Sequence, residues 1–169
     1  MNDILLGNIC SLGAMISESV SSTREKRNEI LGIQIISQFF YAAASVILKG
    51  YSSTAQNVAA VLRNLAAIKN VRSRFVEWFL IGLGVILGLI LNNRGLLGLV
   101  PILTNLEYSM AIFYFKTNER GLKWAFFINK ILYSIFSLSI MDYVGGISNI
   151  VTAVTTLISL FRTEKKAGM

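Results

Sequence analysis

The 169-residue chain has no histidine, a single cysteine and a single proline. Without histidine it lacks the usual proton shuttle and the commonest metal ligand, and this excludes most hydrolytic and metal-dependent chemistries. Cys10 has no second cysteine with which to form an intrachain disulfide or a cysteine-based metal site. We therefore expect a protein that is not an enzyme and that uses no cofactor and no metal.

Acidic residues are also scarce: there are 9, against 16 lysines and arginines, while 54% of all residues are apolar. The apolar residues form seven segments, and most of these have about the 20 residues that a helix needs to cross a bilayer. The segments span 3–22, 28–49, 51–69, 75–91, 95–116, 119–141 and 143–162. We expect an all-α membrane protein with seven transmembrane helices and no soluble domain. We also expect no cleavable signal, because Asp3 stands where a signal would be basic.

The basic residues are distributed unequally among the gaps between these segments. Alternate gaps and the C-terminal end hold three basic residues each, twelve in all, whereas the opposite side of the membrane receives only Lys49 and Arg94. The twelve are Arg24, Lys26, Arg27, Lys69, Arg72, Arg74, Lys116, Arg120, Lys123, Arg162, Lys165 and Lys166. Because cytoplasmic loops collect lysine and arginine, the pattern predicts an N-terminus outside and a C-terminus in the cytoplasm. The net charge of +7 then reflects a cytoplasmic basic collar and not a nucleic-acid surface.

An internal repeat divides the chain. A shift of 92 places residues 39–70 on 131–162 with five identities, where about two or three are expected by chance in so apolar a window. The identical pairs are Tyr41/Tyr133, Ser45/Ser137, Tyr51/Tyr143, Asn57/Asn149 and Leu65/Leu157. We therefore expect two parallel three-helix repeats, 1–72 and 95–163, joined by a linker helix within 73–94 and followed by a cytoplasmic tail over 164–169. This plan is known among secondary transporters.

The 3+1+3 plan resembles the SWEET and PQ-loop (MtN3-like) transporter superfamily. Residues 50–65, and residues 99–102 with the loop 116–123 that follows, are similar to the YgjV-type bacterial inner-membrane proteins, and this resemblance covers nearly the whole chain. It implies a location in the bacterial inner (cytoplasmic) membrane and a substrate site with paired asparagines, where Asn57 and Asn149 fall. SWEET-type proteins commonly have a proline in several repeat helices, whereas this chain has only Pro101. We therefore do not expect the proline-hinged gating of SWEET-type proteins in this chain.

Several charged residues fall inside the predicted helices. Lys130 lies about 11 residues from either end of its helix, near the bilayer midplane, and Glu107 lies midway along the preceding antiparallel helix. We expect a Glu107–Lys130 ion pair, which is either a static pair that orients the second repeat or a substrate or proton site. Arg63 lies about 9 Å from the cytoplasmic end of its helix, with Glu18 at similar depth. We expect these two to form a structural or gate pair.

The repeat shift also predicts where a solute binds, because it aligns Gln38 with Lys130 and Asn57 with Asn149. Repeat transporters bind substrate between their repeats near the midplane. The expected substrate-binding residues are Gln38, Tyr41, Asn57, Glu107, Asn129, Lys130, Tyr133 and Asn149. The amides and the lysine suit neutral polar solutes and small anions equally. The alternative is that the asparagines are hydrogen-bonding groups that join helices.

We therefore expect a small transporter or facilitator that moves a polar small-molecule solute by alternating access. No nucleotide-binding loop is present, so nothing indicates direct ATP drive. The alternative is a non-transporting receptor or complex subunit of the same fold, because fold does not fix function. A sealed, ion-paired core would favour this alternative, and a wet cavity would favour transport. The expected partners are the solute and the lipid bilayer, with no nucleic acid; a homo-oligomer is left open.

Overall fold

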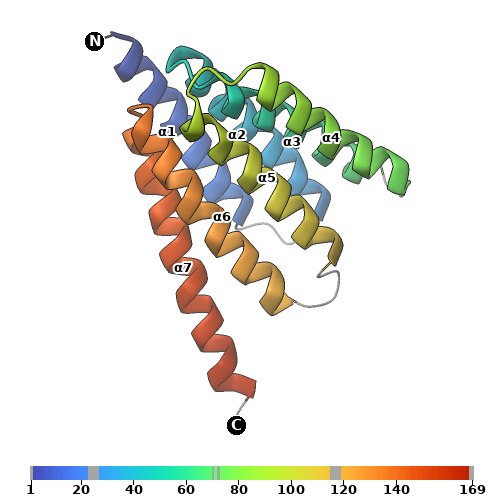
Figure 1. Ribbon diagram of the computed structural model, residues 1–169. Helices are drawn as coiled ribbons and strands as arrows, with labels where there is room; N and C mark the ends of the chain where they lie inside the picture. The colour runs from blue at the N-terminus through green and yellow to red at the C-terminus, as the bar shows by residue number, and fades with distance from the viewer. Residues whose placement is uncertain (1, 23–26, 70, 72, 115–118, 168–169) are drawn as a thin grey trace.

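The computed structural model describes residues 2–22, 27–69, 71, 73–114 and 119–167, and these residues form seven α-helices (Figure 1). The helices are α1 (Asn2–Ser22), α2 (Arg27–Ile47), α3 (Tyr51–Ile68), α4 (Arg74–Ile90), α5 (Leu96–Tyr114), α6 (Glu119–Ser139) and α7 (Tyr143–Ala167). The predicted all-α fold is confirmed, and most predicted segments match a helix to within a few residues. The exception is α7, which continues through most of the predicted tail because Glu, Lys and Ala there are good helix formers. The basic residues Arg24, Lys26, Arg72 and Lys116 lie outside the described residues.

Six of these helices pack in a ring, and α4 lies outside it. Around the ring α1 contacts α2, α2 contacts α3, α3 contacts α5, α5 contacts α6, α6 contacts α7, and α7 contacts α1. The remaining helix, α4, packs against α3 and α5. Helices that the repeat shift makes equivalent, such as α3 and α7, therefore lie on opposite sides of the ring. The end at which α1 begins is called the N-terminal end below, and the end at which α7 stops is called the C-terminal end (Figure 1).

Two turns at the N-terminal end have the same conformation. Lys49 follows α2 with φ = 58°, and Met141 follows α6 with φ = 64°. These residues are 92 positions apart, as the sequence repeat predicts. In the first turn Gly50 N donates to Ser45 O over 2.7 Å and Lys49 N donates to Val46 O over 3.1 Å. This pair of bonds is the Schellman motif, which satisfies carbonyls at a helix C-terminus.

The second turn repeats both bonds at equivalent positions. Asp142 N donates to Ser137 O over 2.9 Å, and Met141 N donates to Leu138 O over 3.1 Å. Neither left-handed residue is a glycine, the residue that ordinarily occupies this position. Both turns therefore have a non-glycine residue in the left-handed conformation.

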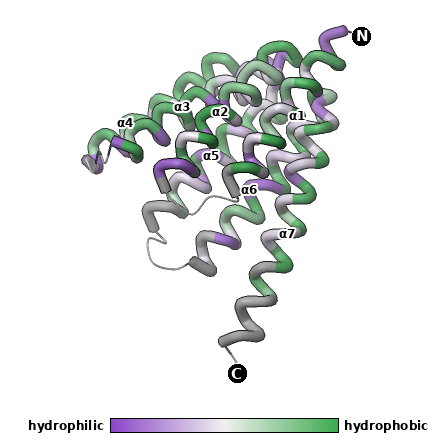
Figure 2. Tube along the Cα trace, turned by 180° about the vertical axis from the view of Figure 1, so that it is seen from behind, coloured by the Kyte–Doolittle hydropathy of each residue, from purple (hydrophilic) through white to green (hydrophobic). Residues whose placement is uncertain are grey.

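Many interior positions hold small or polar side chains, and many large apolar side chains lie on the outside. Ser11, Ser37 and Thr104 are fully buried, whereas Leu96 is 85% exposed and Phe75 is 78% exposed. On the face shown in Figure 2, apolar residues run along most of the length of the helices. Among the described helices, only α1, over Asn2–Val20, is by itself long and apolar enough to cross a bilayer. The apolar stretches Leu31–Ile47, Leu96–Ala111 and Tyr143–Ile158 are shorter.

An apolar cluster, called the plug below, lies near the N-terminal end of the ring. It consists of the buried residues Leu48, Phe136 and Ile140 with Ile4 and Val100 packed against them. Leu48 and Ile140 are equivalent under the repeat shift, and each directly precedes the left-handed residue of its turn. The plug thus joins the two halves of the chain across the ring.

Candidate functional site

Polar side chains from both halves of the chain meet inside the ring, in what we call the axial layer. It consists of Glu18, Tyr41, Ser53, Lys130, Tyr133 and Ser148. Lys130 Nζ lies 3.6 Å from Glu18 Oε1, and it also lies 5.3 Å from the centre of the Phe126 ring. In the ring of helices α7 stands between α1 and α6, so this ion pair crosses the interior.

The predicted Glu107–Lys130 pair is wrong, because the partner of Lys130 is Glu18. Glu107 is half-buried on α5, and its Oε2 has no hydrogen-bond partner among the described residues. At 3.6 residues per turn, Glu107 points to the side of α5 opposite that of Asn105 and Ser109, which contact α3. Matching depth and antiparallel helices were therefore insufficient to define the pair, since Lys130 is bound by an acidic residue of α1 and not of α5.

Two tyrosines that the repeat makes equivalent reach across the ring from opposite sides. The Tyr41 hydroxyl on α2 donates to Glu18 Oε2 over 3.2 Å and lies beside Ser148 on α7. The Tyr133 hydroxyl on α6 lies 3.3 Å from Ser53 Oγ on α3. Each tyrosine thus contacts a serine on a helix from the other half of the chain. Only the tyrosines are equivalent under the repeat shift, because the shift aligns Ser53 with Gly145 and Ser148 with Gln56.

A second network joins α3 to α5 and is called the seam network below. The Arg63 Nη1 atom donates to Asn105 Oδ1 over 3.2 Å and to Ser109 Oγ over 2.7 Å. Asn105 Nδ2 donates to Gln56 Oε1 over 2.6 Å, and Gln56 Nε2 donates to Gly84 O over 2.8 Å. The chain of hydrogen bonds therefore runs from α5 through α3 to α4.

The seam network shows that the predicted Glu18–Arg63 pair is wrong. Arg63 follows Gln56 by seven residues, or about two turns, so both side chains lie on the face of α3 that is directed to α5. Glu18 is bound to Lys130 and Tyr41 instead. Two charges at similar depth were again assigned to each other although they occupy different faces of the ring.

Glycines of α4 allow it to approach the seam network. A Cβ atom on Gly84 would lie 3.1 Å from Ala59 Cβ, and one on Gly88 would collide with Gln56 Nε2. A side chain at Gly88 would therefore push α4 away from α3 and α5. Because Gly84 has no side chain, its backbone carbonyl can accept the bond from Gln56.

The predicted amide residues have different environments. Asn57 and Asn149 are both buried, and the Asn57 Nδ2 atom has no hydrogen-bond partner among the described residues. Asn129 donates to the Thr104 backbone carbonyl over 2.8 Å and so joins α6 to α5 as a packing group. Gln38 is half-buried on α2, and no hydrogen bond joins its side chain to another described residue. Of the predicted site residues, the structure brings Tyr41, Lys130 and Tyr133 into the axial layer with Glu18.

Sequence reasoning missed the neutral members of both networks: Ser53, Gln56, Asn105, Ser109 and Ser148. Spacing contains a signal for some of them, because Gln56 and Arg63 are seven residues apart and Asn105 and Ser109 are four apart. Both spacings place two polar side chains on one face of a helix. Serines in apolar helices carry no comparable signal, since a serine can also hydrogen-bond to its own helix. Among the described residues no cluster of carboxylate and thiol groups is suited to hold a metal ion.

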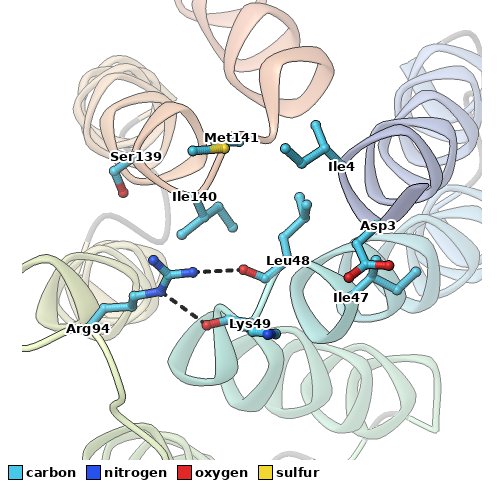
Figure 3. Close-up of a pocket in the computed structure, with 9 residues that line it drawn as sticks. All are labelled: Asp3, Ile4, Ile47, Leu48, Lys49, Arg94, Ser139, Ile140 and Met141. Carbon is cyan, nitrogen blue, oxygen red and sulfur yellow. Dashed lines mark hydrogen bonds between the residues drawn. The ribbon is translucent and has the colours of Figure 1, made fainter. Parts of the chain in front are cut away.

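A cavity of about 170 Å³ lies at the N-terminal end, beside the plug (Figure 3). Its lining consists of Asp3, Ile4, Ile47, Leu48, Lys49, Arg94, Ser139, Ile140 and Met141. Arg94 Nη2 donates to Leu48 O over 2.9 Å and Arg94 Nε donates to Lys49 O over 3.2 Å, as the dashed lines in Figure 3 show. The loop between α4 and α5 thereby holds the first Schellman turn in place.

The second Schellman turn is held from α1. Asn8 Nδ2 donates to Met141 O over 2.9 Å, and Asn8 Oδ1 accepts a bond of 2.9 Å from Val144 N. Both turns are thus fixed by side chains from other elements, which keeps the N-terminal end closed around the plug.

The comparisons with known proteins agree with the membrane character of the chain. A family model described as Imp-YgjV, bacterial inner membrane protein, matches residues 5–167. A search of curated proteins and a search of solved structures each find no match. The matched range includes nearly all of the described helices and every residue of the axial layer and the seam network.

Proposed function

The chain belongs to the Imp-YgjV family of bacterial inner membrane proteins, and on this premise we propose that it is a transporter or facilitator for a polar small solute. The observation that carries the proposal is the axial layer, in which charged and phenolic groups from both halves of the chain meet inside a ring of helices. Membrane helices bury such groups at a high energetic cost, and they usually do so along solute or ion pathways. We further propose that the protein is not an enzyme and needs no cofactor.

The proposed architecture is the SWEET-like one, with two parallel three-helix repeats and α4 as the linker helix. The ring of contacts and the paired Schellman turns support it, because both are unchanged when the two halves are exchanged. The apolar exterior supports a multi-pass arrangement, in which helices that are individually too short or too polar to span a bilayer cross it as part of the bundle.

The proposed orientation has the N-terminal end outside. In a variant whose Cys10 is replaced by alanine, Lys49→Cys and Lys69→Cys place exposed thiols at opposite ends of the ring. A membrane-impermeant maleimide added to intact spheroplasts should label the first and label the second only after lysis. Labelling of both from the same side would contradict the orientation and the number of crossings together.

The proposed mechanism is a rocking of one repeat against the other. In the present conformation the plug closes the N-terminal end. In the axial layer the Glu18 side chain is 25% exposed. The α3–α5 interface is fixed by the seam network and covered by α4, so it serves as the hinge. The α1–α7 interface lies across the ring from it and opens and closes the path.

Uptake into proteoliposomes tests transport. Tyr41→Phe and Tyr133→Phe remove only the hydroxyls that cross the ring, and Tyr143→Phe removes an exposed hydroxyl as the matched control. With a panel of labelled polar solutes, the first two variants should lose at least about tenfold in rate, equal to about 1.4 kcal/mol, and the control should not. Uptake that is insensitive to all three changes would reject the axial layer as the path.

A second candidate function is a non-transporting receptor or complex subunit, and the Glu18–Lys130 pair favours it because an ion-paired core can be static. Water access separates the two candidates. In the cysteine-free background, Ser53→Cys and Ser148→Cys place thiols in the axial layer, and a small charged methanethiosulfonate reagent reports whether water reaches them. Rapid reaction at both supports transport, whereas protection of both together with no solute uptake supports the receptor or subunit.

A further inference from the structure

The Arg63 guanidinium has no carboxylate beside it among the described residues. Both of its hydrogen bonds go to neutral groups, the amide oxygen of Asn105 and the hydroxyl of Ser109. Glu18 is already paired with Lys130. Glu107 lies on the side of α5 opposite Asn105 and Ser109, to which Arg63 donates. An arginine within a membrane helix is costly unless it is paired with opposite charge or reaches water. The seam network therefore holds a positive charge that its own side chains leave uncompensated.

The geometry of the guanidinium leaves one edge available. Both hydrogen bonds originate at Nη1, and they account for the two hydrogens of that nitrogen. The Nε and Nη2 atoms form the other edge, whose two parallel N–H groups match the spacing of two oxygens of a carboxylate or phosphate. Asn105 and Ser109 thus fix the orientation of the guanidinium while its bidentate edge remains for a ligand.

The position of Arg63 connects this edge with the proposed path. The phenols of Tyr108 and Tyr133 lie near the guanidinium. Tyr133 belongs to the axial layer, where its hydroxyl contacts Ser53. Arg63 is therefore the member of the seam network that lies near the axial layer, and its charge is close to the interior of the ring. Lys130 does not provide an uncompensated positive charge, because Glu18 neutralises its ammonium group.

From these contacts we infer that Arg63 anchors a site for a small oxyanion, a carboxylate or a phosphate, that binds the Nε–Nη2 edge. The inference rests on the proposed transport function, since it names the chemical class of the solute. The same chemistry has two sources, a free anion and the phosphate of an anionic lipid headgroup, and the experiment below separates them.

The experiment uses the full chain in nanodiscs of phosphatidylcholine alone and in nanodiscs that also contain phosphatidylglycerol. The melting temperature is measured against increasing sodium acetate, sodium phosphate or glycerol at fixed ionic strength. Arg63→Gln keeps an amide donor near Asn105 and Ser109 but removes the charge and the bidentate edge, and Arg63→Lys keeps the charge alone. Arg94→Gln, at the N-terminal cavity, is the matched loss of an arginine outside the site.

In phosphatidylcholine we expect saturable stabilisation of the wild type by acetate or phosphate and none by glycerol. Arg63→Gln should weaken this binding at least about tenfold and Arg63→Lys less, because charge alone replaces part of a bidentate contact. Arg94→Gln should bind as the wild type does. Unaltered binding in both Arg63 variants overturns the inference, and so does the absence of saturable oxyanion binding to the wild type in either bilayer.

The remaining outcomes show whether the bound oxyanion is a free anion or a lipid headgroup. They also separate a failure of the oxyanion site from a failure of the proposed transport function. If phosphatidylglycerol stabilises the wild type but not Arg63→Gln, and free anions do not bind, the occupant is a lipid headgroup and the solute assignment is overturned. If the wild type moves neutral solutes into proteoliposomes but binds no oxyanion, this inference fails while the proposed function stands. If it binds oxyanions at Arg63 but moves no solute, the site stands and transport fails.

Discussion

The α3–α5 interface and the α1–α7 interface occupy equivalent places in the ring, but their chemistry differs. At the first, Arg63 and Ser109 hydrogen-bond to each other across the interface. Under the repeat shift their equivalents are Thr155 and Ser17. Thr155 donates to Thr152 O over 2.9 Å and Ser17 donates to Gly13 O over 2.9 Å, so each bonds to its own helix.

This difference shows how one backbone plan can serve two mechanical purposes. Hydrogen bonds between helices, with α4 packed over them, resist separation at the α3–α5 interface. At the α1–α7 interface the Asn8 bonds hold the N-terminal end, where α7 begins. Farther along, the equivalent hydroxyls are satisfied within each helix, so the two helices can separate without leaving those groups unpaired. In the proposed mechanism, this asymmetry is the reason for placing the hinge at the α3–α5 interface and the opening at the α1–α7 interface.

The largest expected effect concerns the Glu18–Lys130 pair, which joins the repeats without belonging to either interface. Reversing one charge, by Glu18→Lys or Lys130→Glu, should destabilise the folded state by about 3–5 kcal/mol because a buried charge loses its partner. The double exchange should recover part of the loss. The melting temperature in detergent measures this, with Glu107→Gln as the control that should change it little. Equal losses in the single and double variants would contradict the pair.

The next effect compares identical substitutions at equivalent positions of the two interfaces. Ser109→Ala removes an acceptor from the Arg63 guanidinium and should lower stability by about 1.5–3 kcal/mol, as hydrogen bonds to charged groups do. Ser17→Ala removes only a bond within α1 and should change stability by about 0.5 kcal/mol or less. Chemical denaturation in mixed micelles provides both values. Similar losses in the two variants would remove the basis for treating the interfaces as different.

A further comparison tests the cover that α4 provides. Gly88→Ala places a methyl group against Gln56 and Ile102 and should destabilise by about 1–3 kcal/mol through overpacking. Gly82, on the same helix, has no atom within 4 Å of an added Cβ, so Gly82→Ala should be neutral or slightly stabilising. Melting temperatures of the two variants decide this. If the Gly88 variant is as stable as the wild type, α4 does not pack tightly on the seam network.

The smallest effect concerns the two Schellman turns, which differ at one position: Gly50 in the first is Asp142 in the second. Asp142 Oδ1 accepts a bond of 2.9 Å from Gly145 N and so caps α7. Burial raises the pKa of this carboxyl, although the Ser11 hydroxyl and the Gly145 amide act in the opposite direction. Because the folded protein binds this proton more tightly than the unfolded chain does, stability should fall as pH rises between the unfolded and folded pKa values.

Asp142→Asn keeps a capping oxygen but does not titrate, so this part of the pH dependence should disappear in the variant. Thermal unfolding between pH 3.5 and 7 provides the comparison. The same slope in wild type and variant would show that other groups produce it.

The sequence predicted the helices, the repeat offset and which charges lie inside them, but it did not predict their partners. Hydropathy marks a segment as helical because apolar length is a property of the chain alone. The offset of 92 was visible in pairs such as Tyr41 and Tyr133, and it recurs in the Lys49 and Met141 turns. The partners of Lys130 and Arg63 depend on how each helix is rotated about its axis. The depth of a residue such as Glu107 in the membrane does not show which neighbouring helix its side chain faces.

The central claim is that the α1–α7 interface opens whereas the α3–α5 interface stays closed. The most direct test is to measure how far the helices of each interface move apart in a bilayer. Spin-label pairs at Ile16 and Val154 report on the α1–α7 interface, and pairs at Leu62 and Met110 report on the α3–α5 interface; all four side chains are exposed. With Cys10 replaced by alanine, double electron–electron resonance in nanodiscs gives the two distance distributions. The account predicts two populations or a broad distribution for Ile16–Val154 and one narrow population for Leu62–Met110. Equally narrow distributions, or broadening at α3–α5 alone, would contradict it.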